Sequence, residues 1–266
     1  MTASAPAASF DSPPLLRIRH ISVRFGGILA LDDLCFDVES GQICGLIGPN
    51  GAGKTTLFNC LSRLYQPDRG DIWFAGRPLL SLPVHAIASV SIARTFQNLA
   101  LFAGMTVREN VMVGAHCRSR GGFLANALRL PFVGREETLM AERADALIEK
   151  LALAAFSDTP CGELTFATRK RVELARALAS EPKLLLLDEP AGGLNRQEVE
   201  ALCDLIVSIR DQFKLTVLLV EHHMSMVTRV SDTIVVLNFG RKIAEGTPAE
   251  IQRHPGVIGA YLGTAA

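Results

Sequence analysis

The sequence predicts an α/β fold in which a mainly parallel sheet carries an inserted helical sub-domain. Short apolar runs alternate with helical patterns along most of the chain, an order typical of parallel strands joined by crossover helices. Between roughly Leu99 and Cys161 the strand signals disappear and helical spacing takes over. A chain of 266 residues can bury a sizeable core, as one large domain or as one domain with a sub-domain.

The strands of this sheet are predicted from short runs that are apolar on both faces. Such runs are typical of strands buried between two layers. They cover QICGLI (42–47), KLLLLDE (183–189), LTVLLVE (215–221) and TIVVLN (233–238). The segment after the first run, TTLFNCLSRLY (55–65), is predicted to be a helix, and FGRKIAEG (239–246) a turn leading into a short edge strand.

The insertion is predicted to be helical. REETLMAERADALIEKLAL (135–153) places apolar residues at helical spacing, namely Leu139, Ala146, Leu147 and Leu151. The preceding segment, 116–132, mixes Gly, Pro and three arginines, and its structure stays open. Residues 1–14 are rich in Ala, Ser and Pro and lack the basic and apolar regions of a secretory signal, so we expect a disordered tail.

Composition narrows the function classes. Lys plus Arg and Asp plus Glu both number 27, which argues against a general nucleic-acid binder. The chain is 48% hydrophobic with a mean hydropathy of +0.26, yet no apolar run reaches the roughly 18 residues of a bilayer span. Buried parallel strands and a docking face for a partner would account for this. The six cysteines form no Cys-x-x-Cys pair, so we expect neither a zinc site nor disulfides, and a cytosolic location.

A glycine-rich loop follows the first predicted strand. Residues 48–56, GPNGAGKTT, match the phosphate-loop pattern G-x-x-x-x-G-K-[ST]. Glycines let backbone N–H groups face phosphate oxygens, the helix N-terminus favours negative charge, and the lysine reaches the terminal phosphates. An ordinary glycine-rich turn is the alternative, but the strand before the loop and the helix after it favour a nucleotide site. Its residues are Gly48, Pro49, Asn50, Gly51, Ala52, Gly53, Lys54, Thr55 and Thr56.

Two carboxylates end the strand over 183–189. Asp188 closes the apolar run and Glu189 follows it, at the sheet edge where open α/β sheets bind ligands. We predict that Asp188 and the Thr55 hydroxyl hold Mg²⁺, and that Glu189 polarises the attacking water. A solvated strand end is the alternative for these carboxylates, and the phosphate loop makes the functional interpretation the preferred one.

Two further segments offer polar side chains. In VEHHMSM (220–226), a histidine at a strand end can sense a γ-phosphate, but the spacing alone does not choose between His222 and His223, and a surface histidine is the alternative. In ARTFQN (93–98), Gln97 is a neutral amide able to reach magnesium or water, although most glutamines only face solvent.

In this order, the stretches resemble the ATP-binding subunit of ABC transporters over roughly residues 15–262. GPNGAGKTT resembles the Walker A loop, ARTFQN the Q-loop, LLLLDEP the Walker B strand, LVEHH the switch-histidine segment and AGGLN (191–195) the D-loop. The resemblance implies Glu189 as catalytic base, His222 as switch histidine and Gln97 as magnesium sensor. It also implies Phe25 as the aromatic residue that stacks on adenine. Asn195 departs from the aspartate that many D-loops carry.

The same resemblance implies a P-loop NTPase (RecA-like) core with an N-terminal antiparallel β portion. In this organisation residues 15–266 form one domain. Its helical sub-domain covers about 99–180, and a C-terminal family extension covers about 240–266.

The resemblance sharpens towards one branch. RFGGILALDDL, IARTFQNLALFAGMTVRENVMVGAH and the ending GTPAEIQRHPGVIGAYLG resemble ATPase subunits of branched-chain (hydrophobic) amino acid uptake systems. This implies ATP and Mg²⁺ as cofactors and a peripheral position at the cytoplasmic face of the inner or plasma membrane. The implied partners are two membrane permeases, a second and commonly different ATPase chain, and a periplasmic binding protein, with no nucleic acid.

LTFAT (164–168) occupies the place of the family signature, usually L-S-G-G-Q, which grips the γ-phosphate bound to a partner subunit. Thr165 keeps a hydroxyl, but Ala167 replaces a glycine, and a left-handed backbone there would cost about 1–2 kcal/mol. We therefore hypothesise a weakened signature in an asymmetric pair of sites. Arg169, Lys170 and Arg171 oppose the helix dipole. The triphosphate bound to a partner subunit could offset the unfavourable position of these cations. The alternative is a solvated basic helix face without a functional role.

Three alternatives stay open. An export ATPase, such as one handling lipopolysaccharide, has a similar cassette, although the ending argues against it. A soluble ABC ATPase of translation or DNA repair usually carries two cassettes or long coiled-coil insertions, which this chain lacks. A regulatory module that never hydrolyses ATP is disfavoured by Glu189 and kept open by Ala167. The cargo rests on the resemblance alone, because ATPase subunits do not touch it.

Overall fold

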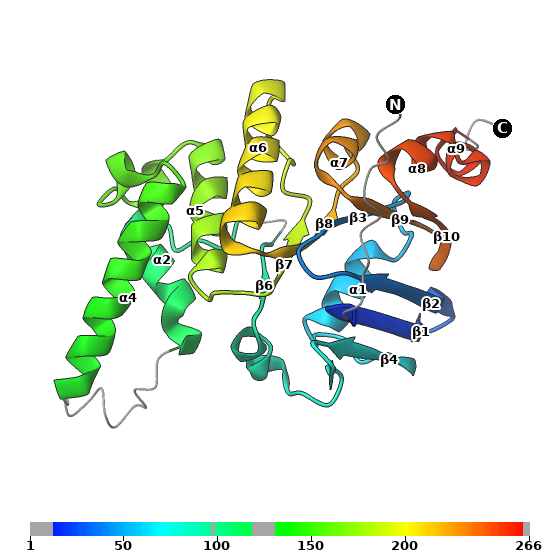
Figure 1. Cartoon of the computed structure of the whole chain (residues 1–266), viewed down its shortest axis with the longest axis horizontal. Coiled ribbons are helices and arrows are strands. Elements are labelled where there is room, and N and C mark those ends of the chain that lie inside the picture. Colours follow the sequence, from blue (N-terminus) through cyan, green and yellow to red (C-terminus); the bar gives the residue numbers. More distant parts are fainter. Residues whose placement is uncertain (1–12, 97–98, 119–130, 263–266) are drawn as a thin grey trace, which may run out of the picture.

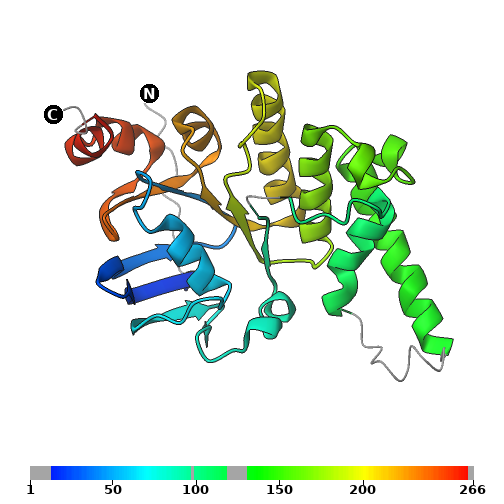
Figure 2. The same ribbon diagram turned by 180° about the vertical axis from the view of Figure 1, so that it is seen from behind.

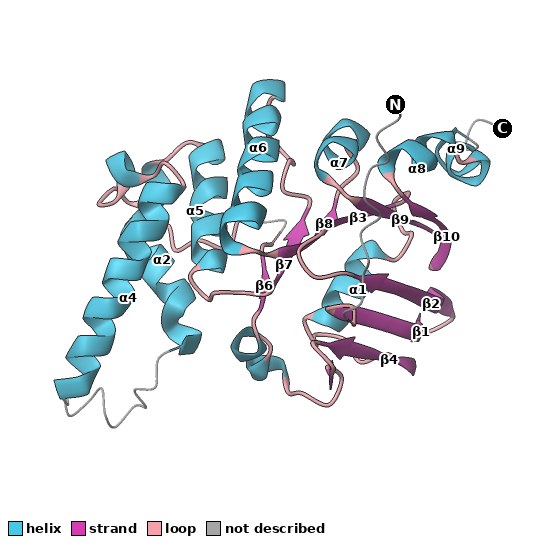
Figure 3. Ribbon diagram, in the orientation of Figure 1, coloured by secondary structure: helices cyan, strands magenta, loops and turns pink. Residues whose placement is uncertain are grey.

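The computed structural model describes residues 13–96, 99–118 and 131–262. Its strands form a four-stranded antiparallel sheet, in the order β2-β1-β4-β5, and a six-stranded sheet, in the order β10-β9-β3-β8-β7-β6 (Figures 1 and 3). The first contains β1 (Leu16–Phe25), β2 (Ile28–Val38), β4 (Arg69–Phe74) and β5 (Arg77–Pro78). The second contains β3 (Ile43–Ile47), β6 (Ile92–Arg94), β7 (Leu184–Asp188), β8 (Thr216–Val220), β9 (Thr233–Asn238) and β10 (Arg241–Gly246).

The larger sheet is parallel except for β10, which pairs antiparallel with β9. This confirms the predicted fold class, including the antiparallel N-terminal portion and the edge strand at 241–246. The helices are α1 (Lys54–Leu61), α2 (Val107–Ala115), α4 (Pro131–Lys150), α5 (Phe166–Leu178), α6 (Arg196–Phe213), α7 (Met224–Val230), α8 (Pro248–Arg253) and α9 (Pro255–Leu262). Short 3-10 turns are η1 (Val84–Ala86), η2 (Ala88–Val90), η3 (His116–Arg118), η4 (Ala154–Phe156) and η5 (Cys161–Glu163).

The leucine run of β7 shows why a continuous apolar strand is needed here. Successive side chains of a strand point to opposite faces. Leu185 and Leu187 join the core with α6 and α7, whereas Leu184 and Leu186 join the core with α1 and the antiparallel sheet. Both faces of the sheet are therefore covered by other elements, as the view from behind shows (Figure 2).

The helices α2, α4 and α5 gather at the β6–β7 end of the sheet (Figure 1). Helices α2 and α5 approach closely at Gly114. A Cβ at this position would lie only 2.0 Å from the backbone oxygen of Arg176, so a larger residue would not fit. The described part of the insertion contains one isolated bridge, between Thr106 and Pro160, and no named strand, in agreement with the predicted loss of strand signals. Helix α4 begins at Pro131, four residues before the predicted start.

Some sequence predictions lie outside the described residues. These are the tail over residues 1–12, Gln97, and most of the segment over 116–132, of which 119–130 are not described. Among the described residues, no helix combines the length and apolar character that a bilayer crossing needs. All six cysteines are free thiols, and four of them are buried in the cores.

Candidate nucleotide-binding site

The phosphate loop joins β3 to α1 in a conformation that only glycine tolerates at two positions. Gly48 and Gly53 have φ values of 155° and 102°. A Cβ on Gly53 would lie 2.5 Å from the Ala30 oxygen, and one on Gly48 would lie 2.2 Å from the Leu237 oxygen. Residues of strands β2 and β9 therefore pack closely against the loop. The N–H of Asp32 also donates a hydrogen bond of 3.0 Å to the carbonyl of Gly240.

Lys54 is folded back into this loop. Its ammonium donates hydrogen bonds to the carbonyls of Gly48 at 2.7 Å and Pro49 at 3.0 Å, and the residue is only 7% exposed. Burial lowers the pKa of Lys54, and the negative charges of Glu189 and Asp188 partly oppose that shift. The structure therefore brings together the lysine and both carboxylates predicted for the site. Thr55 is exposed and Thr56 half-buried in the first turn of α1.

Asp188 and Glu189 lie at the carboxyl end of β7. Asp188 is 5% exposed, and its Oδ2 accepts a hydrogen bond of 2.7 Å from the Arg94 guanidinium. Glu189 has a left-handed backbone with φ 46°, and its N–H donates to the Val220 oxygen at 2.9 Å. Such a conformation costs a non-glycine residue about 1–3 kcal/mol and is found mostly at functional sites. Main-chain strain thus coincides with the residue predicted to be the catalytic base.

The two histidines after β8 are distinguished by Glu221. The Nδ1 atom of His223 lies 3.1 Å from Glu221 Oε2, within hydrogen-bond distance, whereas that of His222 lies 3.8 Å away. The fully buried Glu221 carboxylate also accepts the N–H groups of His222 and His223, and that of Ala191 at 2.8 Å. His223 is thereby held by Glu221. His222, the predicted switch histidine, has the more exposed side chain.

Phe25 ends β1 next to a second aromatic residue. It is 45% exposed, and its ring meets that of Tyr65 edge-on, with 5.1 Å between the ring centres. An exposed aromatic ring suits stacking on a nucleotide base, the role that the resemblance implies for Phe25.

The signature segment LTFAT forms the start of α5. Thr165 is the N-cap residue, and its Oγ1 accepts the N–H of Thr168 at 3.3 Å. Ala167 lies in the first turn of the helix and is not among the residues with positive φ. The left-handed strain considered from the sequence is therefore absent. The first-turn N–H groups of a helix have no intrahelical acceptors, which leaves donors for an anion.

Lys170 is not part of a solvated face, so that alternative is wrong for this residue. Lys170 is only 5% exposed, and Arg169 and Arg171 are half-buried. The Lys170 ammonium lies 5.5 Å, and the Arg169 guanidinium 6.0 Å, from the centre of the Phe166 ring. Cation–π attraction to Phe166 thus offsets part of their unfavourable position at the positive end of the helix dipole.

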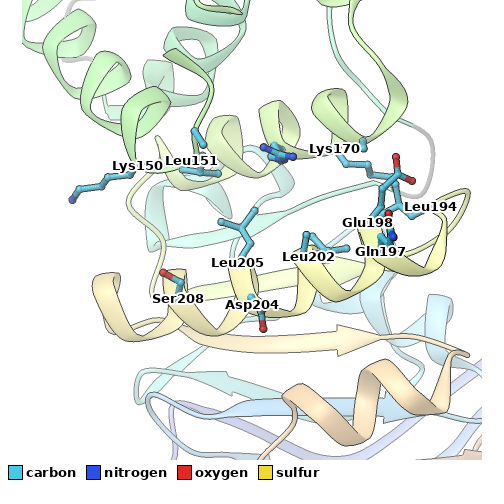
Figure 4. A pocket seen from close by; sticks show the side chains of 14 residues that line it. Lys150, Leu151, Lys170, Leu194, Gln197, Glu198, Leu202, Asp204, Leu205 and Ser208 are labelled. Carbon is cyan, nitrogen blue, oxygen red and sulfur yellow. The ribbon is translucent and has the colours of Figure 1, made fainter. Parts of the chain in front are cut away.

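A groove of about 530 Å³ separates α5 from α6 (Figure 4). Ala167 and Lys170 line it from α5, and Leu194 and Glu198 line it from the α6 side, with Lys170 and Glu198 at the same end of the groove. The D-loop therefore lies beside the signature segment of the same chain. Asn195, the departure noted above, is the N-cap of α6 and forms a reciprocal capping box with Glu198. Asparagine caps a helix as well as aspartate does.

Comparison with known proteins settles the family. Residues 31–192 match the ABC transporter family, and residues 241–266 match the family of branched-chain amino acid ATP-binding cassette transporters. The chain belongs to the ATP-binding subunits of ABC transporters. The second match covers the C-terminal ending from which the uptake branch was inferred, and it confirms the predicted resemblance.

Relatives of this cassette cover nearly its whole length. It is 43% identical to the high-affinity branched-chain amino acid transport ATP-binding protein BraF of Pseudomonas aeruginosa, over 96% of the chain and 100% of BraF. It is 40% identical to LivG of Escherichia coli, with the same coverage. The crystal structure of the ADP conformation of MJ1267, an ATP-binding cassette of an ABC transporter, superposes with a TM-score of 0.82 at 30% identity, over 95% of this chain and 100% of MJ1267. The cassette is an ATPase subunit.

Four contributors to the site were not singled out in the sequence. Arg94 binds Asp188, Glu221 joins the D-loop to the histidine segment, and Tyr65 accompanies Phe25. Glu173 of α5 accepts the N–H of Phe96 at 3.0 Å and so ties the helical part to the Q-loop. Arg94 stands within ARTFQN, so a cation three residues before Gln97 was an available signal. The other three depend on contacts between distant segments.

Glu173 is expected to make the stability of the cassette depend on pH. Burial raises the pKa of Glu173 above its ordinary value of 4.5, against the opposing hydrogen bond from Phe96 and the charges of Lys170 and Arg176. A carboxyl with a raised folded pKa costs stability when ionised, and the cost disappears as pH falls from above that pKa towards 4.5. We expect the unfolding free energy of the unchanged chain, minus that of Glu173→Gln, to increase as pH falls from 7 to 4.5.

Urea unfolding of both chains at several pH values measures this difference. Glu163→Gln, which makes the same chemical change at an exposed carboxyl of η5, is the control for the substitution itself. A difference for Glu173→Gln that stays constant or decreases over this range would contradict the assigned cost.

Proposed function

We propose that this cassette powers the import of branched-chain amino acids or related small hydrophobic molecules, by hydrolysing ATP as one of two paired ATPase chains. The observation that carries the proposal is the match of the C-terminal segment to the branched-chain family, on a chain whose relatives are branched-chain amino acid transport proteins. In this proposal the native pair contains a second, different cassette, two permeases complete the membrane part, and a periplasmic protein delivers the cargo.

The residues of the site suit an Mg²⁺-bound nucleotide. The crowding around Gly48 and Gly53 leaves a curled loop that can cradle phosphates, and the Lys54 ammonium lies within it. The Thr55 hydroxyl and the Asp188 carboxylate are the hard oxygen donors that Mg²⁺ prefers. When bound, Mg²⁺ would neutralise charge on the β- and γ-phosphates. Glu189 would accept the proton of the attacking water, and His222 would contact the γ-phosphate.

A surface for the permeases lies where the Q-loop meets the helical part. A groove of about 540 Å³ runs between the η1–η2 segment on one side and α2 and α5 on the other. Four apolar side chains lining it are 41–54% exposed: Leu64, Val84, Phe96 and Val113. Exposed apolar groups gathered in one groove suit burial by a helix of a membrane partner. Docking here would hold the cassette at the cytoplasmic face of the membrane.

The rate of ATP hydrolysis per molecule of the purified chain, measured against protein concentration, tests the proposed pairing. ATP is sandwiched between two cassettes in this proposal, so a competent pair gives a rate per molecule that rises with concentration. We expect such a rise, because the signature retains Thr165 and the N–H donors of the α5 start. Nucleotide binding is measured in parallel. Binding without hydrolysis at every concentration would show that a different second cassette is required.

Ala167→Gly is the companion variant for the hypothesis of a weakened signature. Because Ala167 has no left-handed backbone, we expect its replacement to change the rate at saturating concentration by less than about threefold, an effect below 1 kcal/mol. A much larger increase would show that the Cβ itself weakens the grip on the partner's nucleotide.

A further inference from the structure

Arg94 connects the magnesium end of the site to the proposed permease groove. Its guanidinium donates to Asp188 Oδ2 at 2.7 Å, and also to Asn59 Oδ1 at 2.8 Å and Ser62 Oγ at 3.1 Å, at the end of α1. The side chains of Arg94 and Asp188 are only 10% and 7% exposed. The guanidinium is thus a buried fork that fixes one oxygen of the predicted magnesium ligand relative to the helix that follows the phosphate loop.

The same guanidinium is bordered by two aromatic rings. Its central carbon lies 5.5 Å from the ring centres of Phe58 and Phe96. Phe58 is fully buried, whereas Phe96 is 43% exposed and lines the groove of Leu64, Val84 and Val113. Arg94 also lines this groove, so its guanidinium lies between the groove and Asp188. A partner that covers Phe96 would press on the fork that holds Asp188.

The charges around Asp188 show why the fork matters. The charge of Asp188 also acts on the Lys54 ammonium, which lies inside the phosphate loop. Arg94 therefore sets the orientation of a carboxylate that also interacts with the lysine of the phosphate loop. Asp188 Oδ2 is held by Arg94, and Oδ1 has no hydrogen-bond donor among the described residues. A cation held by Asp188 would use this oxygen.

We propose that Arg94 is a positioning residue that orients Asp188 for Mg²⁺ and relays occupancy of the groove to the magnesium site. The proposal rests on the proposed function, since it requires an Mg²⁺-bound nucleotide and a partner in the groove. It predicts that loss of the Phe96 ring, which contacts Arg94 in the groove, alters the contribution of Mg²⁺ to ATP binding.

The test compares two dissociation constants of ATP, one in EDTA and one in excess Mg²⁺, using the Glu189→Gln chain so that ATP is not consumed. The readout is the ratio of the dissociation constant in EDTA to that in Mg²⁺. This ratio isolates the Mg²⁺ contribution from nucleotide binding itself. Partners that orient metal ligands typically affect metal affinity about 10- to 100-fold. We therefore expect Arg94→Met to lower the ratio by about tenfold and to leave the constant in EDTA unchanged. Arg94→Lys, which keeps the charge but not the fork, should also lower it.

The groove arm uses Phe96→Ala, which is expected to lower the ratio about two- to fivefold through the lost cation–π contact. Val113→Ala, an apolar truncation in the same groove away from Arg94, is the matched control and should leave it unchanged. Phe96 and Val113 are both surface positions, so both variants should fold, as thermal unfolding would verify.

An unchanged ratio in Arg94→Met would overturn the positioning role, and a raised ratio would show that Arg94 competes with the cation instead. A ratio retained in Arg94→Lys would show that the positive charge alone is sufficient. It would contradict a role for the forked hydrogen bonds of the guanidinium. An unchanged ratio in Phe96→Ala would overturn the relay. If the Glu189→Gln chain binds no ATP under either condition, the proposed function itself fails.

Discussion

Glu189→Gln is expected to bind ATP as well as the unchanged chain and to hydrolyse it at least about a hundredfold more slowly. A positioned general base contributes about 10²- to 10⁴-fold to a reaction rate. Glutamine has nearly the shape of glutamate, and the backbone hydrogen bond from residue 189 to Val220 does not depend on the side chain. The left-handed backbone at this position is therefore expected to persist, with only the proton acceptor removed.

Single-turnover hydrolysis and equilibrium ATP binding measure the two halves of this prediction. A chain that binds ATP without consuming it should also accumulate as a closed pair, which size-exclusion chromatography with ATP detects. Glu200→Gln makes the same chemical change on the exposed surface of α6 and should leave the rate unaltered. Residual activity within tenfold of the unchanged chain would exclude Glu189 as the base.

Lys54→Ala is expected to weaken ATP binding roughly 10- to 150-fold. A hydrogen bond to a charged group contributes about 1.5–3 kcal/mol, which corresponds to this change in Kd. Lys54 is a buried cation in the centre of the phosphate loop, and burial already lowers its pKa. Phosphate oxygens would supply the negative charge that the loop carbonyls of Gly48 and Pro49 only partly replace.

Calorimetric titration with ATP measures the loss directly. Lys183→Ala removes an exposed lysine just before β7 and should leave Kd unchanged. Because Lys54 donates to two loop carbonyls, the unfolding temperature of the variant without nucleotide is recorded as well. Unaltered binding in a folded variant would contradict the role of Lys54 as a phosphate ligand.

The sequence was sufficient wherever one local pattern sets the geometry. The phosphate loop needs only its glycines and flanking elements, and LLLLD fixes both the burial of β7 and the position of Asp188 at its end. The contact of Arg94 with Asp188 could not be predicted, for a different reason. Parallel pairing of β6 with β7 places Arg94 opposite Leu186, two residues before Asp188, and no local pattern reveals which strand becomes the neighbour of β6.

The start of α5 shows a second limit. Read along the chain, three cations in a first turn look unfavourable and call for an anion or for solvent. In the packed helix Lys170 is buried, with its ammonium over the ring of Phe166 and its charge acting on Glu173 of the same helix. The same ring lies against the D-loop, where a Cβ on Gly193 would be 2.9 Å from it. A contact of this kind exists only once the D-loop and the signature segment are packed together.

The buried carboxylate of Glu221 has a consequence for how this cassette can vary. It accepts backbone N–H groups from Ala191, His222 and His223, so the D-loop and the histidine segment share one acceptor. Glutamine would offer a donor where an acceptor is needed, and alanine would leave three N–H groups without a partner. A substitution of Glu221 is therefore expected to disturb the D-loop and the histidine segment together. Substitutions of loop side chains leave these backbone donors in place, so the two loops depend on the carboxylate at position 221 more than on their own side chains.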